Sequence, residues 1–165
     1  MSLVVSDSGP IHYLVLCGAI ETLPKLYNQL IIPGAVFKEL THANTPPEVK
    51  GWIQSLPAWA SIKSPVSIDS AMRLGSGERE AISLALELHA TQVLIDDRLA
   101  RRIAMERGLL VGSTIGILEQ AAAIGLLDLP VVMKKLLNTN FRIDVQVVRD
   151  VLERDAARRG DSGTG

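Results

Sequence analysis

The fold is indicated most clearly by the segment Val93-Leu94-Ile95-Asp96-Asp97-Arg98-Leu99-Ala100-Arg101-Arg102. In it, a short apolar run ends in two adjacent carboxylates and then continues as a basic segment of helix-forming residues. This order is typical of a buried parallel strand that delivers acidic side chains to the open end of a sheet before the chain turns into a helix. Residues 3–10, Leu-Val-Val-Ser-Asp-Ser-Gly-Pro, have the same form, with Asp7 after the apolar run and Pro10 suited to the first turn of a helix.

Apolar runs and helical periodicities alternate along the rest of the chain. We expect strands at residues 3–5, 30–32, 60–66, 92–95 and 109–111. We expect helices at residues 11–16, 19–27, 33–40, 47–56, 78–89, 98–107, 115–124, 129–137 and 145–157. Strands that alternate with helices form right-handed βαβ units. The predicted fold is therefore a three-layer α/β/α arrangement around a parallel sheet of four or five strands, with further helices at the C-terminus.

The length of 165 residues predicts a single domain, which we place at residues 1–157. Within it, residues 125–157 are expected to form a C-terminal helical extension. Residues 158–165 are rich in glycine and serine, so we predict a disordered tail. The chain shows no signal-peptide pattern and no apolar run of membrane-spanning length, so we expect a cytoplasmic protein without a membrane partner.

Composition narrows the possible chemistry. The formal net charge is −1, so a nucleic-acid footprint on this protein must be local. Cys17 is the one cysteine, which excludes a disulfide framework within the chain. The three histidines are scattered and do not follow zinc-site spacing. Glycine-rich phosphate loops and nucleophile-elbow motifs are absent, which leaves the carboxylates as the main candidate chemistry.

Asp7 and the Asp96-Asp97 pair both follow predicted strands. Ligands of open α/β sheets bind beyond the carboxyl ends of the strands, so we expect these acids to share one edge. Carboxylates that are forced together repel and raise one another's pKa, and a hard cation such as Mg²⁺ relieves that repulsion. Helix capping is the other interpretation of these positions, and it explains one aspartate of the pair better than two.

Two glutamates are further candidates. Glu39 lies at the edge of an apolar helix face, and from spacing alone it is equally a surface residue. Glu78 stands in the first turn of its predicted helix, on the face that carries Ala81 and Ile82, whereas Glu80 belongs to the solvated stripe. We therefore favour Glu78 over Glu80 as a site residue.

Three arginines, Arg98, Arg101 and Arg102, occupy one side of the helix that follows the acidic pair. Guanidinium groups match phosphate geometry, so these residues and the Ser8 hydroxyl are candidates for binding a phosphate-containing substrate. An ordinary solvated helix face explains the arginines about equally well.

Five motifs occur in a fixed order. They are Ser6-Asp7-Ser8-Gly9-Pro10, Ile32-Pro33 followed by Val36 and Glu39-Leu40, Gly77-Glu78-Arg79-Glu80-Ala81-Ile82, Leu94-Ile95-Asp96-Asp97-Arg98-Leu99-Ala100 and Gly112-Ser113-Thr114-Ile115-Gly116-Ile117-Leu118. Over residues 2–125 the chain resembles the PIN-domain family, the small metal-dependent ribonucleases that include VapC-type toxins. It is most similar to a subgroup that begins with the Ser-Asp-Ser-Gly-Pro motif.

The resemblance implies a catalytic acidic quartet at Asp7, Glu39, Glu78 and Asp97, with Asp96 beside it as a further metal ligand. In the family such acids bind Mg²⁺ or Mn²⁺ and cleave RNA. The chain departs from the toxins in two places: Ile95 stands where they carry threonine, and Glu78 where they usually carry aspartate.

Two functions follow as hypotheses. The first is a metal-dependent endoribonuclease, in its narrower form the toxin of a type II toxin–antitoxin pair with RNA as substrate and an antitoxin protein as partner. The second is a non-catalytic PIN-like module that binds nucleic acid or protein. The apolar faces of the C-terminal helices fit either packing within the chain or an interface, and the resemblance implies a homodimer.

Overall fold

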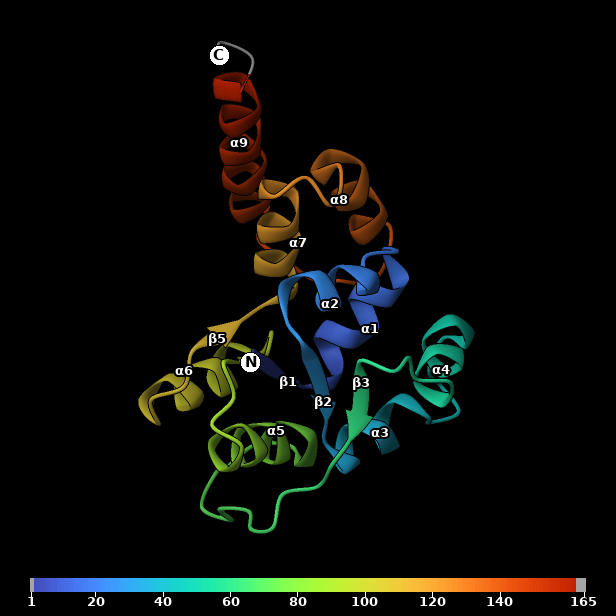
Figure 1. The fold of residues 1–165 in the computed structure, drawn as a ribbon, viewed down its shortest axis with the longest axis vertical. Coiled ribbons are helices and arrows are strands. Elements are labelled where there is room, and N and C mark those ends of the chain that lie inside the picture. Colours follow the sequence, from blue (N-terminus) through green and yellow to red (C-terminus); the bar gives the residue numbers. More distant parts are fainter. Residues whose placement is uncertain (1, 163–165) are drawn as a thin grey trace.

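The computed structural model describes the backbone of residues 2–162 and the side chains of residues 2–160. Within this range five strands form one sheet: β1 (Leu3–Ser6), β2 (Gln29–Ile32), β3 (Ala60–Ile62), β4 (Gln92–Leu94) and β5 (Val111–Gly112). The strand order is β3-β2-β1-β4-β5, and every neighbouring pair is parallel. The predicted α/β fold around a parallel sheet is therefore confirmed (Figure 1).

The connecting helices follow the predicted order. They are α1 (Ser8–Leu16), α2 (Leu23–Leu26), α3 (Gly34–Leu40), α4 (Pro47–Gln54), α5 (Ser76–Glu87), α6 (Arg98–Glu106), α7 (Thr114–Ala123), α8 (Leu129–Leu137) and α9 (Val145–Ser162). A short 3-10 turn, Ile20–Thr22, precedes α2. Helices α5 and α6 cover one face of the sheet, whereas α1, α3, α4 and α7 lie on the other, with α8 and α9 packed beyond α7 (Figure 1).

The strands are buried on both faces, which explains why they read as continuous apolar runs. Val4 and Leu30 pack with the helices α1, α3 and α7, while Val5 and Ile31 point to the opposite side and pack against α5 and α6. All four side chains are buried. Successive residues of each strand thus serve two separate cores, and the sheet is the shared middle layer.

The strand predicted at residues 60–66 is shorter in the structure, because β3 ends at Ile62. Pro65 lacks the N–H group that a strand in this position would need to extend the ladder. The irregular segment that follows is fixed at two points: Met72 is buried with the core of α5 and α6, and Asp69 pairs with Arg107 at 2.6 Å.

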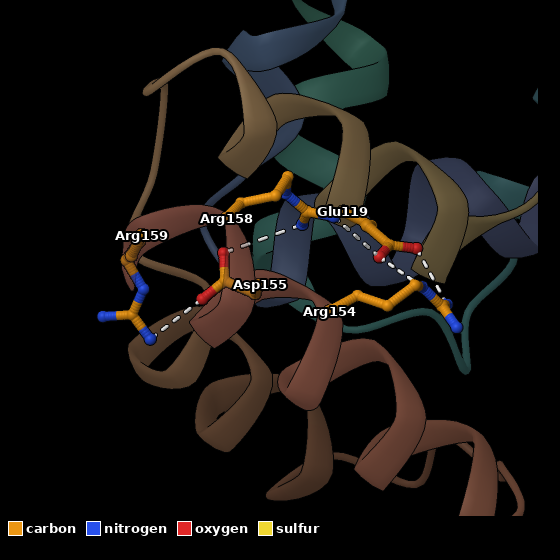
Figure 2. A network of polar contacts seen from close by, with 5 residues as sticks. All are labelled: Glu119, Arg154, Asp155, Arg158 and Arg159. Atoms are coloured by element: carbon orange, nitrogen blue, oxygen red, sulfur yellow. Dashed lines mark hydrogen bonds and ion pairs between the residues drawn. The ribbon is translucent and has the colours of Figure 1, made fainter. Parts of the chain in front are cut away.

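The C-terminal helices are joined to the body of the protein by a network of charged side chains (Figure 2). Glu119 of α7 accepts two hydrogen bonds from Arg154 of α9, at 2.8 and 3.0 Å, and one from Arg158 at 3.3 Å. Asp155, which is only 3 % exposed, pairs with Arg159 at 3.0 Å and with Arg158 at 3.8 Å. This network fixes the docking of α9 on α7.

The prediction of a disordered tail at residues 158–165 is wrong for residues 158–162, which continue α9 to Ser162. The pairs of Asp155 with Arg158 and Arg159 have the i,i+3 and i,i+4 spacing that stabilises a helix, and basic residues favour a helix C-terminus. Residues 163–165 lie outside the described part of the chain.

Most of the apolar face of the C-terminal helices is used within the chain. Val132, Leu136 and Val151 are buried in the core that α1 and α7 share, whereas Leu137 and Val147 are exposed. Packing within the chain is thus the main role of this face, and the homodimer and the antitoxin partner stay predictions. No helix in residues 2–162 is both long and apolar enough to cross a membrane.

We expect Glu119→Gln to loosen α9. The change removes the negative charge that Arg154 and Arg158 share, so the free energy of unfolding should fall by about 1 kcal/mol, about 3 °C in Tm. Amide hydrogen exchange should accelerate in α9 more than in the sheet. Glu153→Gln, a matched change at an exposed position of α9, is the control, and equal effects of the two variants would contradict the prediction.

Candidate functional site

The sheet places the carboxyl ends of β1 and β4 next to each other. From β1 the chain moves outward to β2 and β3, then returns to the other side of β1 as β4 and continues to β5. A crevice opens at such a switch of direction, beyond the carboxyl ends of the two strands. Here the N–H of Asp7 donates to the carbonyl oxygen of Leu94 at 2.9 Å, so Asp7 and the Asp96-Asp97 pair meet at this edge.

Asp7 is the buried member of the acidic group, with 7 % of its surface exposed. It occupies the N-cap position of α1, but its side chain makes no capping hydrogen bond, so the capping interpretation does not explain it. Burial raises the pKa of Asp7 to about 7, the Ser8 N–H opposes the rise, and the negative charges of Glu78, Glu39 and Asp96 add to it. Asp7 therefore lies within electrostatic reach of carboxylates from three other elements.

Glu39 reaches the site from α3. The Ser8 hydroxyl donates to Glu39 Oε2 at 2.7 Å, which turns the exposed carboxylate toward the start of α1. Gly77, in the first turn of α5, makes the approach possible. A Cβ at position 77 would overlap Glu39 Oε1 and would lie 3.1 Å from Asp7 Oδ1, so both carboxylates rest against this glycine.

Glu78 is half-buried, and its Oε2 accepts a hydrogen bond from the Gly75 N–H at 3.3 Å. Burial raises its pKa, as do the charges of Asp97 and Glu39, while the Gly75 N–H lowers it. The prediction that Glu80 points to solvent is wrong. It is half-buried, and its Oε1 accepts from the Ala35 N–H at 3.1 Å, where it stabilises the start of α3.

The two aspartates of the pair have different partners. Both oxygens of Asp96 accept from Thr114, at 2.8 Å from its N–H and 2.6 Å from its hydroxyl, which fastens the start of α7 to the end of β4. Burial raises the pKa of Asp96, while the two Thr114 hydrogen bonds and the charge of Arg101 lower it. Asp97 is exposed and caps α6 by accepting from the Ala100 N–H at 2.9 Å.

The three arginines do not act as one set. Arg101 is half-buried, and its Nη1 donates to the carbonyl oxygens of Ile95 and Gly112, both at 2.8 Å, so it holds the ends of β4 and β5 together. Arg98 and Arg102 are exposed, and of these two only Arg98 lines the cleft beside Asp96. That cleft, of about 410 Å³, is completed by Arg142 and Phe141 from the segment between α8 and α9, and we call it the Phe141 cleft.

The donor set suits a hard divalent cation, because it consists of carboxylate oxygens whose mutual repulsion a cation would relieve. As the side chains stand, no group of three or more His, Cys, Asp or Glu in the described part of the chain encloses a metal position. The hydrogen bonds of Glu39, Glu78, Asp96 and Asp97 to local partners explain this spacing. Binding a metal would require some of these carboxylates to move toward the ion, and Glu39, Glu78 and Asp97 each use a single oxygen in these hydrogen bonds.

Three contributors were not identified as site residues from the sequence. Gly77 belongs to one of the five motifs, but its role as a space for two carboxylates depends on α3 lying against α5. The glycines at positions 75 and 77 are the sequence signal that could have indicated such a close approach. Phe141 and Arg142 carry no motif at all. They follow Asp96 by more than 40 residues, and only the folding of the C-terminal extension brings them to the site.

A comparison with protein-family models matches residues 3–156 to the family described as DUF3368: PIN domain. The chain belongs to the PIN-domain family. PIN domains are commonly nucleases. No curated protein matches the chain. Among solved structures it is similar to a PilT N-terminus domain protein, SSO1118, from the hyperthermophilic archaeon Sulfolobus solfataricus P2, with 15 % sequence identity, a TM-score of 0.47, and coverage of 87 % of this chain and all of that one. The VapC-type resemblance and the Ser-Asp-Ser-Gly-Pro subgroup stay predictions.

We expect Asp7→Asn to stabilise this PIN domain in the absence of metal. As the pH rises from the ordinary value of 3.8 to about 7, the unfolded chain ionises Asp7 before the folded protein does, so the free energy of unfolding falls across this window. Asparagine removes that loss, and Tm at pH 8 should rise by roughly 5 °C. Thermal unfolding in EDTA should show the gain shrinking toward pH 4, and Glu153→Gln should show no such pH dependence.

Proposed function

We propose that this PIN-domain protein is a divalent-metal-dependent endoribonuclease that hydrolyses phosphodiester bonds of RNA. The observation that carries the proposal is the meeting of carboxylates around buried Asp7 at the crevice between β1 and β4. The carboxylates come from separate elements: Glu39 from α3, Glu78 from α5 and the Asp96-Asp97 pair from the end of β4. A structural role alone does not explain why neighbouring acids gather where they raise the pKa of Asp7 and of Glu78.

Asp7, Glu39, Glu78, Asp96 and Asp97 are the residues that would hold Mg²⁺ or Mn²⁺. When bound, the ion supplies positive charge that stabilises the phosphate and lowers the pKa of the attacking water. The chain's own groups orient the ligands: Ser8 holds Glu39, the Gly75 N–H holds Glu78 and Thr114 holds Asp96. Such second partners fix the direction of a ligating carboxylate and tune its basicity.

The surface beside the acids supports a nucleic-acid substrate. The protein as a whole is slightly acidic, but Arg98 and Arg142 lie at the cleft that Asp96 also lines. An acidic cluster next to a local basic surface suits a phosphodiester, because the strand can be held by arginines while the reacting phosphate faces the acids.

The test is cleavage of a fluorescently labelled single-stranded RNA. We expect cleavage with Mg²⁺ or Mn²⁺ and none in EDTA. Asp7→Asn and Glu78→Gln should each lower the rate by about 100-fold or more, since loss of a metal ligand exceeds the loss seen when its outer partner is removed. Glu153→Gln should cleave like the wild type.

Cleavage that persists in EDTA or in both site variants would overturn the proposal. RNA binding without any cleavage in either metal would instead favour a non-catalytic binding module. The toxin role with a cognate antitoxin is the narrower form of this proposal, and it rests on the resemblance alone.

Gly77→Ala tests the metal site without destabilising the fold. Its new methyl group would displace the exposed carboxylate of Glu39 and crowd Asp7, so Mn²⁺ affinity measured by calorimetry should fall roughly ten-fold. Alanine favours a helix, so Tm should not fall. Gly51→Ala, in α4, where an added Cβ meets nothing within 4 Å, is the control and should leave Mn²⁺ affinity unchanged. Equal Mn²⁺ affinity of the two variants would contradict the role of Gly77.

A further inference from the structure

The Phe141 cleft lies directly beside the acidic site, because Asp96 lines both. Its walls come from several parts of the chain, which include the start of α7 at Ser113 and Ile115. The segment after β4 contributes Asp96 and Arg98, while the segment between α8 and α9 contributes Phe141 and Arg142. The volume of about 410 Å³ is in the range of roughly 300–1,000 Å³ that is usual for small-ligand sites.

The aromatic wall of the cleft is held in place. The Tyr13 hydroxyl of α1 donates to Asn140 Oδ1 at 3.0 Å, and the Tyr13 and Phe141 rings meet edge to face with centroids 4.8 Å apart. The Phe141 N–H donates to the Thr139 hydroxyl at 3.1 Å. These contacts tie the α8–α9 segment to the helix that follows Asp7, so Phe141 is presented to the cleft in a fixed position.

The charged wall is mainly basic. Arg98, Arg101 and Arg142 line the cleft with Asp96 as the one acid among the lining residues described. Arg101 is occupied by two backbone carbonyls, whereas Arg98 and Arg142 are exposed. Burial raises the pKa of Tyr13, the charge of Asp96 adds to the rise and that of Arg142 lowers it, so Tyr13 lies within reach of both ends of the cleft.

We propose that the Phe141 cleft binds the nucleotide of a single-stranded RNA that neighbours the phosphate at the acidic site, with its base against Phe141 and its phosphate held by Arg98 and Arg142. The assignment of RNA rests on the proposed function. Aromatic stacking and arginine–phosphate contacts are how proteins hold single strands without reading a sequence. A duplex base pair offers no free face for stacking, so the cleft selects an unpaired segment.

The test is binding of a fluorescein-labelled 12-nucleotide single-stranded RNA in EDTA, followed by anisotropy across a range of salt concentrations. Arg142→Gln should reduce the slope of log affinity against log salt by about 0.7, the value for one lost phosphate contact on a single strand. Arg149→Gln, which removes the same charge from an exposed position on α9, should leave the slope unchanged.

A second arm tests stacking. Phe141→Ala should raise Kd about five-fold or more, and it should abolish the quenching of a 2-aminopurine base placed in the same RNA. Phe141→Trp should restore the quenching, which a merely structural role of this side chain would not require. Because Arg142 is exposed, its variant decides the question through the salt slope even if Phe141→Ala does not fold.

The outcomes separate this proposal from the proposed function. If the wild type binds no RNA, or if the Phe141 and Arg142 variants bind as the wild type does, the cleft is not the nucleotide site, whether or not the protein cleaves RNA. If both variants weaken binding as expected but the wild type cleaves nothing with Mg²⁺ or Mn²⁺, the assignment of the cleft is supported and the proposed nuclease function is overturned.

Discussion

The burial of Asp7 at the sheet edge, with other carboxylates nearby, is the strongest demand that this sequence places on its fold. A buried acid with other acids in electrostatic reach opposes folding, so the surrounding elements must hold it there. The two-sided burial of β1 and β4 supplies that support, and the hydrogen bond from Asp7 to Leu94 fixes the two strand ends in register. Local donors for the other acids, such as Ser8 and Thr114, then limit how far those side chains swing apart.

The fold was predictable because its signals are local. An apolar run that ends in an acid predicts a strand and the sheet edge where it ends, and the alternation of such runs with helices predicts the parallel sheet. The approach of Asp7 and Asp96 follows from that topology alone. Glu39 could not be assigned from its own spacing, since only the packing of α3 against α5 and the resemblance distinguish it from a surface glutamate.

Side-chain direction and long-range pairing were beyond the sequence. Periodicity assigned Glu80 to the solvent, but a neighbouring helix offers it an unpaired N–H, which no helical-wheel argument can include. The end of α9 was misjudged for a similar reason. Its polar, glycine-containing composition predicts a disordered tail. The sequence does not show that Arg158 pairs with Glu119 of α7, or that Arg158 and Arg159 pair with Asp155.

Asp96 serves two parts of the molecule at once. The carboxylate that faces the acidic site also anchors the first residue of α7, and α7 carries the docking surface of α9. A ligand that drew the Asp96 oxygens away would leave the N–H and the hydroxyl of Thr114 without this acceptor, so the acidic edge and the start of α7 compete for the same carboxylate.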